Sequence, residues 1–130
     1  MKLTYLHVNA SGLELFLGPL EAAIMRAAWD KCHTTRRIYN HVREHYESKN
    51  TDDIAFTSIT STVFRLYDRG FLKRTGDKRR HTYIPVADTE ALFVETALRL
   101  TLDRILASYP REAGRIIVEY LRNLRSAANV

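Results

Sequence analysis

The chain has 130 residues, 45% of them hydrophobic, which is enough for one folded domain, or a domain with an appendage, and excludes a disordered tail. Its formal charge is +5, and residues 55–87 hold the whole excess, with seven Lys or Arg against two Asp. A single Cys32, no secretion signal and no apolar run long enough to cross a membrane exclude a disulfide framework within the chain and indicate a cytoplasmic protein.

Residues 1–16 carry apolar side chains at alternate positions in two short pieces, 3–8 and 13–17, separated by residues 9–12. This pattern fits either a small hairpin or an extension that packs on a partner chain. A first helix is then predicted from Pro19, with Gly18 as its N-cap and Glu21 near the positive end of its dipole. Its apolar stripe is typical of core packing.

A second helix is predicted with Thr35 as its N-cap. Its inner face carries Ile38, Val42 and Tyr46. Arg36 and Arg37 lie in the first turn, where cations oppose the helix dipole, so they are interpreted either as ligands of a DNA phosphate or as solvated side chains. His41 and His45 have the spacing of metal ligands, but no third ligand is near in sequence, and no metal is expected.

Residues 55–70 form the stretch on which the prediction of DNA binding depends. One helical face carries Phe56, Ile59, Val63 and Leu66, and Gly70 supplies a left-handed stop. The β-branched residues here also allow a strand, but strict alternation would mix polar and apolar groups on both faces, which favours the helix. The opposite face carries short hydroxyl groups and one arginine, namely Thr57, Ser58, Ser61 and Arg65. Short side chains let a helix approach another surface closely, and the major groove of DNA is the candidate.

Two short strands, 71–75 and 81–86, are predicted around a loop with three adjacent cations, Gly76-Asp77-Lys78-Arg79-Arg80. Three helices followed by a basic two-stranded hairpin describe a winged helix-turn-helix domain, with the third helix as the reader. The predicted fold class is therefore mainly α with a small β wing (α+β). The concentrated positive charge predicts double-stranded DNA as the partner.

Asp88 or Thr89 is predicted to cap a fourth helix to about residue 107, and Pro110 to begin a fifth to about residue 125. The fourth helix is apolar around most of its circumference. This is more apolar surface than two helices can bury on each other. Residues 88–130 are therefore predicted to form a homodimer, with burial on the winged-helix body as the alternative. The predicted organisation is an extension at 1–16, the winged helix at 17–87 and the dimerisation domain at 88–130. The residues expected at the dimer interface are Leu92, Leu98, Leu102, Ile105, Ile117 and Leu121.

Four short motifs follow one another between residues 20 and 85. They are Leu20-Glu21-x-x-Ile24-Met25-x-x-x-Trp29, Ala55-Phe56-Thr57-Ser58-Ile59, Arg65-Leu66-x-x-Arg69-Gly70-Phe71-Leu72 and Arg80-x-x-Tyr83-x-Pro85. In order and spacing they resemble the penicillinase repressor family, a likeness that runs from about residue 17 to the end. The resemblance implies a homodimeric winged-helix transcriptional repressor that binds a pseudo-palindromic operator.

The resemblance also assigns roles by position. It implies major-groove contacts by Thr57, Ser58, Ser61 and Arg65, with Arg65 as the first candidate for a base edge. It implies phosphate contacts by Arg36, Arg74, Lys78, Arg79 and Arg80. No catalytic residue, metal or cofactor is expected.

Two motifs that members of the family carry are missing from the chain. It lacks the Cys-x-Cys pair of the copper-responsive members, so a response to copper is not expected. It also lacks the Asn-Phe pair at which β-lactam-responsive members are cleaved, so a response to β-lactams is not expected. No upstream sensor or protease is identified. Cys32 is interpreted as a packed thiol, with a redox sensor as the alternative. The alternative function is a winged-helix protein-interaction module without specific DNA binding. An enzyme is disfavoured because no phosphate loop or nucleophile motif is present.

Overall fold

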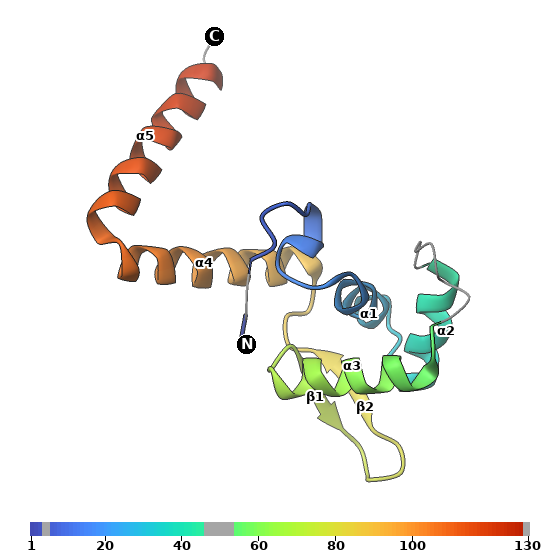
Figure 1. Ribbon diagram of the computed structural model, residues 1–130. Coiled ribbons are helices and arrows are strands. Elements are labelled where there is room, and N and C mark those ends of the chain that lie inside the picture. The colour runs from blue at the N-terminus through green and yellow to red at the C-terminus, as the bar shows by residue number, and fades with distance from the viewer. Residues whose placement is uncertain (4–5, 46–53, 129–130) are drawn as a thin grey trace. The chain divides into compact units, whose positions relative to one another are not determined.

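The computed structural model describes residues 1–3, 6–45 and 54–128 (Figure 1). In chain order the elements are the 3-10 helix η1 (Gly12–Leu15), helices α1 (Pro19–Trp29), α2 (Thr35–His45) and α3 (Phe56–Asp68), strands β1 (Leu72–Thr75) and β2 (Thr82–Pro85), and helices α4 (Glu90–Ser108) and α5 (Pro110–Ala128). This order confirms the predicted α+β class. Tyr46, expected on the inner face of the second helix, lies outside the described residues.

The chain forms two compact units, residues 1–94 and 95–130. The sequence placed the boundary before Asp88, whereas here it falls inside α4. The first turn of α4 belongs to unit 1 through Phe93, which is 1% exposed and makes edge contacts with the ring of Trp29 at 5.7 Å and a tilted contact with Phe71 at 5.6 Å. Of the two predicted caps, Thr89 is the one that acts, since its hydroxyl accepts the Leu92 N–H at 3.1 Å.

Unit 1 is built on a core shared by α1, α2 and α3. The side chains at its centre are at most 1% exposed, and they are Ile24, Ala28, Ile38, Val42, Ile59, Val63 and Leu66. The predicted start of α1 at Pro19 with Gly18 as N-cap is confirmed. The predicted cap of α2 is wrong by one residue, because Thr34 is the residue whose hydroxyl accepts the Arg37 N–H, and Thr35 is already helical.

The N-terminal residues pack on their own unit. A hairpin was one of the two expectations, but the described residues among 1–17 contain η1 and no strand. Leu13, Phe16 and Leu17 are 1%, 4% and 1% exposed, so these apolar side chains are part of the core. The His7 N–H donates to the Leu15 carbonyl at 2.8 Å, which closes the segment that contains η1.

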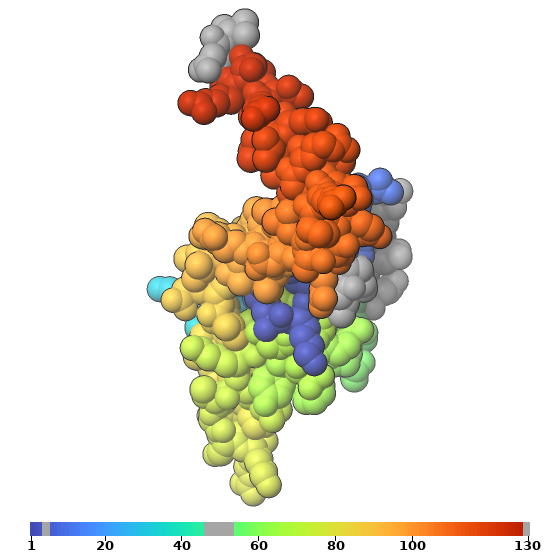
Figure 2. Space-filling model, turned by 90° about the vertical axis from the view of Figure 1, so that its left-hand side faces the viewer, coloured from blue at the N-terminus to red at the C-terminus, as the bar shows by residue number. Residues whose placement is uncertain are grey.

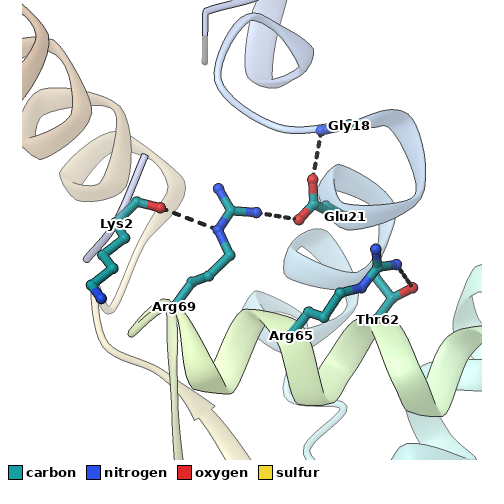
Figure 3. A network of polar contacts seen from close by, with 6 residues as sticks. All are labelled: Lys2, Gly18, Glu21, Thr62, Arg65 and Arg69. Carbon is teal, nitrogen blue, oxygen red and sulfur yellow. Dashed lines mark hydrogen bonds and ion pairs between the residues drawn. The ribbon is translucent and has the colours of Figure 1, made fainter. Parts of the chain in front are cut away.

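A polar network connects three segments of unit 1 (Figure 3). One carboxylate oxygen of Glu21 accepts the Gly18 N–H at 2.9 Å, and the other accepts from the Arg69 guanidinium at 2.6 Å. Arg69, which follows the last residue of α3, also donates to the Lys2 carbonyl at 3.2 Å, while the Lys2 N–H donates to the Arg69 carbonyl at 2.8 Å. The start of α1, the end of α3 and the chain's N-terminal residues are therefore held together.

Strands β1 and β2 form an antiparallel hairpin in which Leu72 pairs with Pro85 and Thr75 with Thr82. The predicted strands are confirmed to within one residue at each end. Gly70, with φ +82, supplies the predicted left-handed stop between α3 and β1. The edge of β2 that faces away from β1 is also hydrogen-bonded, because the Tyr83 N–H donates to the His33 carbonyl at 2.7 Å. The hairpin is thus fixed both to the end of α3 and to the loop before α2.

Unit 2 consists of the rest of α4 and α5. Its only side chains below one tenth exposure among the described residues are Ala97 and Ala113, at 0% and 9%. Across the described residues, no helix is both long enough and apolar enough to span a bilayer.

The network around Glu21 yields a stability prediction. In Glu21→Gln an uncharged amide replaces a carboxylate whose side chain is only 15% exposed, so the hydrogen bond with the charged Arg69 is weakened. We expect a loss of about 1.5–3 kcal/mol in the free energy of unfolding, measured by urea denaturation followed by circular dichroism. The matched control is Glu95→Gln, which removes the exposed pair with Arg99 and should change stability by less than about 0.5 kcal/mol. Equal effects of the two substitutions would contradict the assignment.

Candidate nucleic-acid interface

The outer face of α3 is the centre of the candidate interface. The inner face is fixed, since Ile59, Val63 and Leu66 are fully buried. Because their spacing uses one side of the helix only, the opposite side is left exposed. It carries all four residues that the sequence predicts as base readers, which are Thr57, Ser58, Ser61 and Arg65.

A shallow hollow, open to solvent, lies on this face. Its lining consists of Phe56, Thr57, Thr60, Ser61, Phe64 and Arg65, none of which is acidic. These residues form two parallel rows, because side chains four positions apart lie above one another on a helix. One row (Phe56, Thr60, Phe64) is mainly apolar, and the other (Thr57, Ser61, Arg65) is polar. The hollow therefore presents apolar and hydrogen-bonding groups side by side.

Sequence reasoning missed half of this lining. It assigned Phe56 to the core and gave no role to Thr60 or Phe64, while Ser58, which it did select, is exposed but does not line the hollow. One signal was available: Phe64 is a large apolar residue that stands outside the spacing of the buried positions. Its side chain is 50% exposed.

Three hydroxyl groups along α3 donate to the helix backbone. Thr60 donates to the Phe56 carbonyl at 2.9 Å, and Ser61 and Thr62 donate to the Ser58 carbonyl at 3.1 and 2.8 Å. A hydroxyl has one hydrogen and two acceptor lone pairs, so groups bonded in this way offer acceptors to a ligand. Here the face is suited to accept hydrogen bonds from a base edge and to make apolar contacts.

Arg65 extends along the helix surface (Figure 3). Its guanidinium donates to the hydroxyl of Thr62 at 3.0 Å, and Thr62 itself is 1% exposed. The guanidinium has five N–H donors, so this bond leaves others for a ligand. The contact with Thr62 holds the side chain beside the hollow before any ligand binds.

Arg36 reaches the same region from α2. Its guanidinium carbon lies 4.5 Å from the centre of the Phe56 ring and 5.8 Å from that of Tyr39, and the two rings meet edge to face at 5.3 Å. These cation–π contacts fix an exposed positive charge next to the first residue of α3. Arg36 is therefore held against two rings and is not a freely solvated side chain.

The loop between the strands presents three exposed cations, Lys78, Arg79 and Arg80. Gly76 has φ +95, and a Cβ there would collide with the Arg80 carbonyl oxygen, so the tight turn requires glycine. The Asp77 carboxylate accepts the backbone N–H groups of Arg79 and Arg80 at 2.9 and 3.1 Å. Figure 2 shows this hairpin as a narrow projection from unit 1.

The stem of the hairpin carries the remaining predicted phosphate ligand. The Arg74 guanidinium lies 4.4 Å from the centre of the Tyr67 ring, which contacts Tyr83 at 6.4 Å and Phe64 at 6.0 Å. Arg74 is thus held close to the exposed face of α3 by its contact with the Tyr67 ring. The three loop cations, by contrast, are not among the residues that line the hollow.

Unit 2 exposes most of its apolar side chains. Of the predicted dimer residues, Leu98, Leu102, Ile105 and Leu121 are 46%, 42%, 39% and 59% exposed, and Leu92, on the first turn of α4, is 45% exposed. Ile117 is half-buried. Large exposed apolar side chains in such number are typical of surfaces that contact another chain, so these helices are suited to do so.

The His41–His45 pair and Cys32 carry the remaining side chains with potential chemistry. His41 and His45 stack at 4.2 Å, but among the residues that the structure describes no cluster of three or more His, Cys, Asp or Glu is arranged to hold a metal. Burial raises the pKa of the Cys32 thiol, and Asp30 raises it further. A raised pKa lowers the thiolate fraction at neutral pH, which disfavours the redox sensor, while the Cys32 side chain is partly exposed and not part of the buried core.

Comparison with known proteins agrees with this geometry. The model of the penicillinase repressor family matches residues 17–122, which is most of the chain. A search of curated proteins gave no significant match. The matched region includes α1, helix α3, the basic hairpin and the greater part of the C-terminal helices. The chain therefore belongs to the penicillinase repressor family, whose members are winged helix-turn-helix proteins that bind DNA and repress transcription.

Proposed function

We propose that this protein is a sequence-specific repressor that binds a pseudo-palindromic operator as a homodimer in the cytoplasm and blocks a promoter by occupying it. The observation that carries the proposal is the outer face of α3, where a hollow free of acidic lining residues is bordered by hydrogen-bonding groups. A helix with such a face fits the major groove, where base edges and thymine methyl groups are accessible. The family is one of transcriptional repressors and not a class of enzymes.

The proposed contacts divide into two kinds. Thr57, Ser58, Ser61 and Arg65 read base edges and supply specificity. Positive side chains around them hold phosphates, and these are Arg36, Arg74, Lys78, Arg79 and Arg80. The phosphate contacts supply most of the affinity and make it fall steeply with salt, whereas the base contacts distinguish one sequence from another.

Dimerisation is proposed for the apolar faces of unit 2. Their exposure supports it, because among the described residues of unit 2 only Ala97 and Ala113 are below one tenth exposure, so the apolar side chains of its helices need a partner surface. A two-fold dimer places two copies of α3 about one or two turns of DNA apart, which matches a palindromic operator.

The proposal is tested with fluorescence anisotropy across a salt series. The protein is titrated into the duplex from upstream of its own gene and into a shuffled duplex of equal composition. A specific repressor binds the native duplex about a hundredfold or more tightly, and both affinities fall as salt rises. No binding to either duplex at low salt would reject the proposal and favour a protein-interaction module.

Substitutions separate the two kinds of contact. Arg65→Ala should cost about 1–3 kcal/mol on the cognate duplex and little on the shuffled one. Lys78→Ala should weaken both duplexes alike and reduce the slope of log K against log salt by about 1. Equal loss on both duplexes for Arg65→Ala, or an unchanged slope for Lys78→Ala, would remove that residue from its assigned role.

The dimer is tested with Leu121→Asp. Because Leu121 is 59% exposed, the change should leave the fold of a single chain intact but place a charge in an apolar interface. We expect the mass measured by light scattering to fall from that of a dimer to that of a monomer, with weaker binding to the palindromic duplex. Arg122→Ala, on the neighbouring exposed position, is the control and should remain dimeric. A dimeric Leu121→Asp protein would place the interface elsewhere.

A further inference from the structure

Phe64 is an apolar residue that neither the core nor the predicted contacts of α3 account for. It is 50% exposed, on the face of α3 that carries the candidate base readers. A single exposed apolar side chain is common on protein surfaces and needs no explanation by itself. Phe64 differs because it lies at the end of the apolar row Phe56, Thr60, Phe64 inside the hollow.

The ring of Phe64 is held in place from one side. Tyr67, one turn further along α3, contacts it at 6.0 Å with the two planes tilted by 54°. Tyr67 is itself covered by the Arg74 guanidinium at 4.4 Å. The exposed part of the Phe64 ring is therefore supported by its neighbours, and a positive charge lies close by.

The charges around the hollow restrict what can occupy it. Arg65 lines it, Arg36 lies over Phe56 at one end, and Arg74 lies over Tyr67 next to Phe64 at the other. No acidic residue is among the lining side chains. The occupant must therefore combine an apolar group with surrounding negative charge. Duplex DNA offers this combination in the major groove, where the thymine 5-methyl group is the apolar element between two phosphate backbones.

Thr60 adds a second apolar group to the same row. Its hydroxyl hydrogen is donated to the Phe56 carbonyl at 2.9 Å, so Thr60 presents a methyl group and acceptor lone pairs. An A·T pair displays a methyl group on thymine beside the N6 amino donor of adenine. The apolar row and its hydroxyl acceptor match these two features together.

We propose that Phe64 is a specificity-determining residue that reads a thymine 5-methyl group in the major groove. The inference rests on the proposed function, because it requires α3 to lie in that groove. It adds an apolar contact to the hydrogen-bonding readers Thr57, Ser58, Ser61 and Arg65.

The probe is the upstream duplex in two forms, one with thymine and one with deoxyuridine at every thymine position. Deoxyuridine keeps base pairing and the O4 acceptor and lacks only the methyl group. Burying one methyl group contributes about 0.8 kcal/mol, so wild-type affinity should fall about fourfold for each methyl contacted. In a symmetric dimer the same contact is made twice, and the fall becomes about sixteenfold.

The variant Phe64→Ala decides whether Phe64 causes the effect. Its affinity for the thymine duplex should fall by a similar factor, and its ratio between the two duplexes should approach one. Val8→Ala, which truncates another exposed apolar residue of unit 1 (76% exposed), is the control and should keep the wild-type ratio. Circular dichroism checks that each variant is folded.

The outcomes separate this inference from the proposed function. Binding of the thymine duplex with no loss on deoxyuridine leaves the repressor proposal intact and overturns the role of Phe64. The same holds if Phe64→Ala keeps the wild-type ratio of the two affinities, whether or not it weakens both duplexes equally. The methyl effect would then arise from DNA shape or from another residue. Absence of binding to any duplex overturns both proposals.

Discussion

The carboxylate of Glu21 is the contact on which the geometry of unit 1 depends. One of its oxygens satisfies the first backbone N–H before α1, and the other binds Arg69 just after α3. Both partners are donors that are costly to leave without an acceptor in a partly buried setting. As a result the start of α1 and the end of α3 are held next to each other. The orientation of the outer face of α3 therefore depends on α1. The Leu-Glu pair at the start of the family motif thus has a structural reason to contain a carboxylate.

The regular parts of this fold could be predicted because they depend on local patterns. The spacing of Ile59, Val63 and Leu66 predicted the buried side of α3, and glycines at 70 and 76 have the positive φ values that their turns require. Residues 1–16 could not be predicted, because a short alternating apolar pattern fits a strand, an extended segment or a 3-10 turn equally well. What decides between them is the burial of Leu13 and Phe16 in a core made by distant helices.

The candidate site shows the same division. Helical periodicity alone brought Thr57, Ser61 and Arg65 to one face, and the basic loop was evident from its charges. The bond between Arg65 and Thr62, the cover that Arg36 makes over Phe56 and the exposure of Phe64 depend on rotamers and on packing between elements. The spacing of the buried positions already leaves Phe64 off the inner face. The three-dimensional arrangement adds that its side chain is half exposed and lines the hollow.

The position of the single tryptophan has a practical consequence. Trp29 donates its indole N–H to the Ala87 carbonyl at 2.9 Å and contacts Phe93 on the first turn of α4. It therefore lies where the winged-helix unit continues into the helix that leads to unit 2. Because indole emission responds to hydrogen bonding and solvent exposure, the protein contains its own optical sensor at this junction. A signal that releases the first turn of α4 becomes visible as a change in the emission wavelength of the unlabelled protein, without any DNA in the sample.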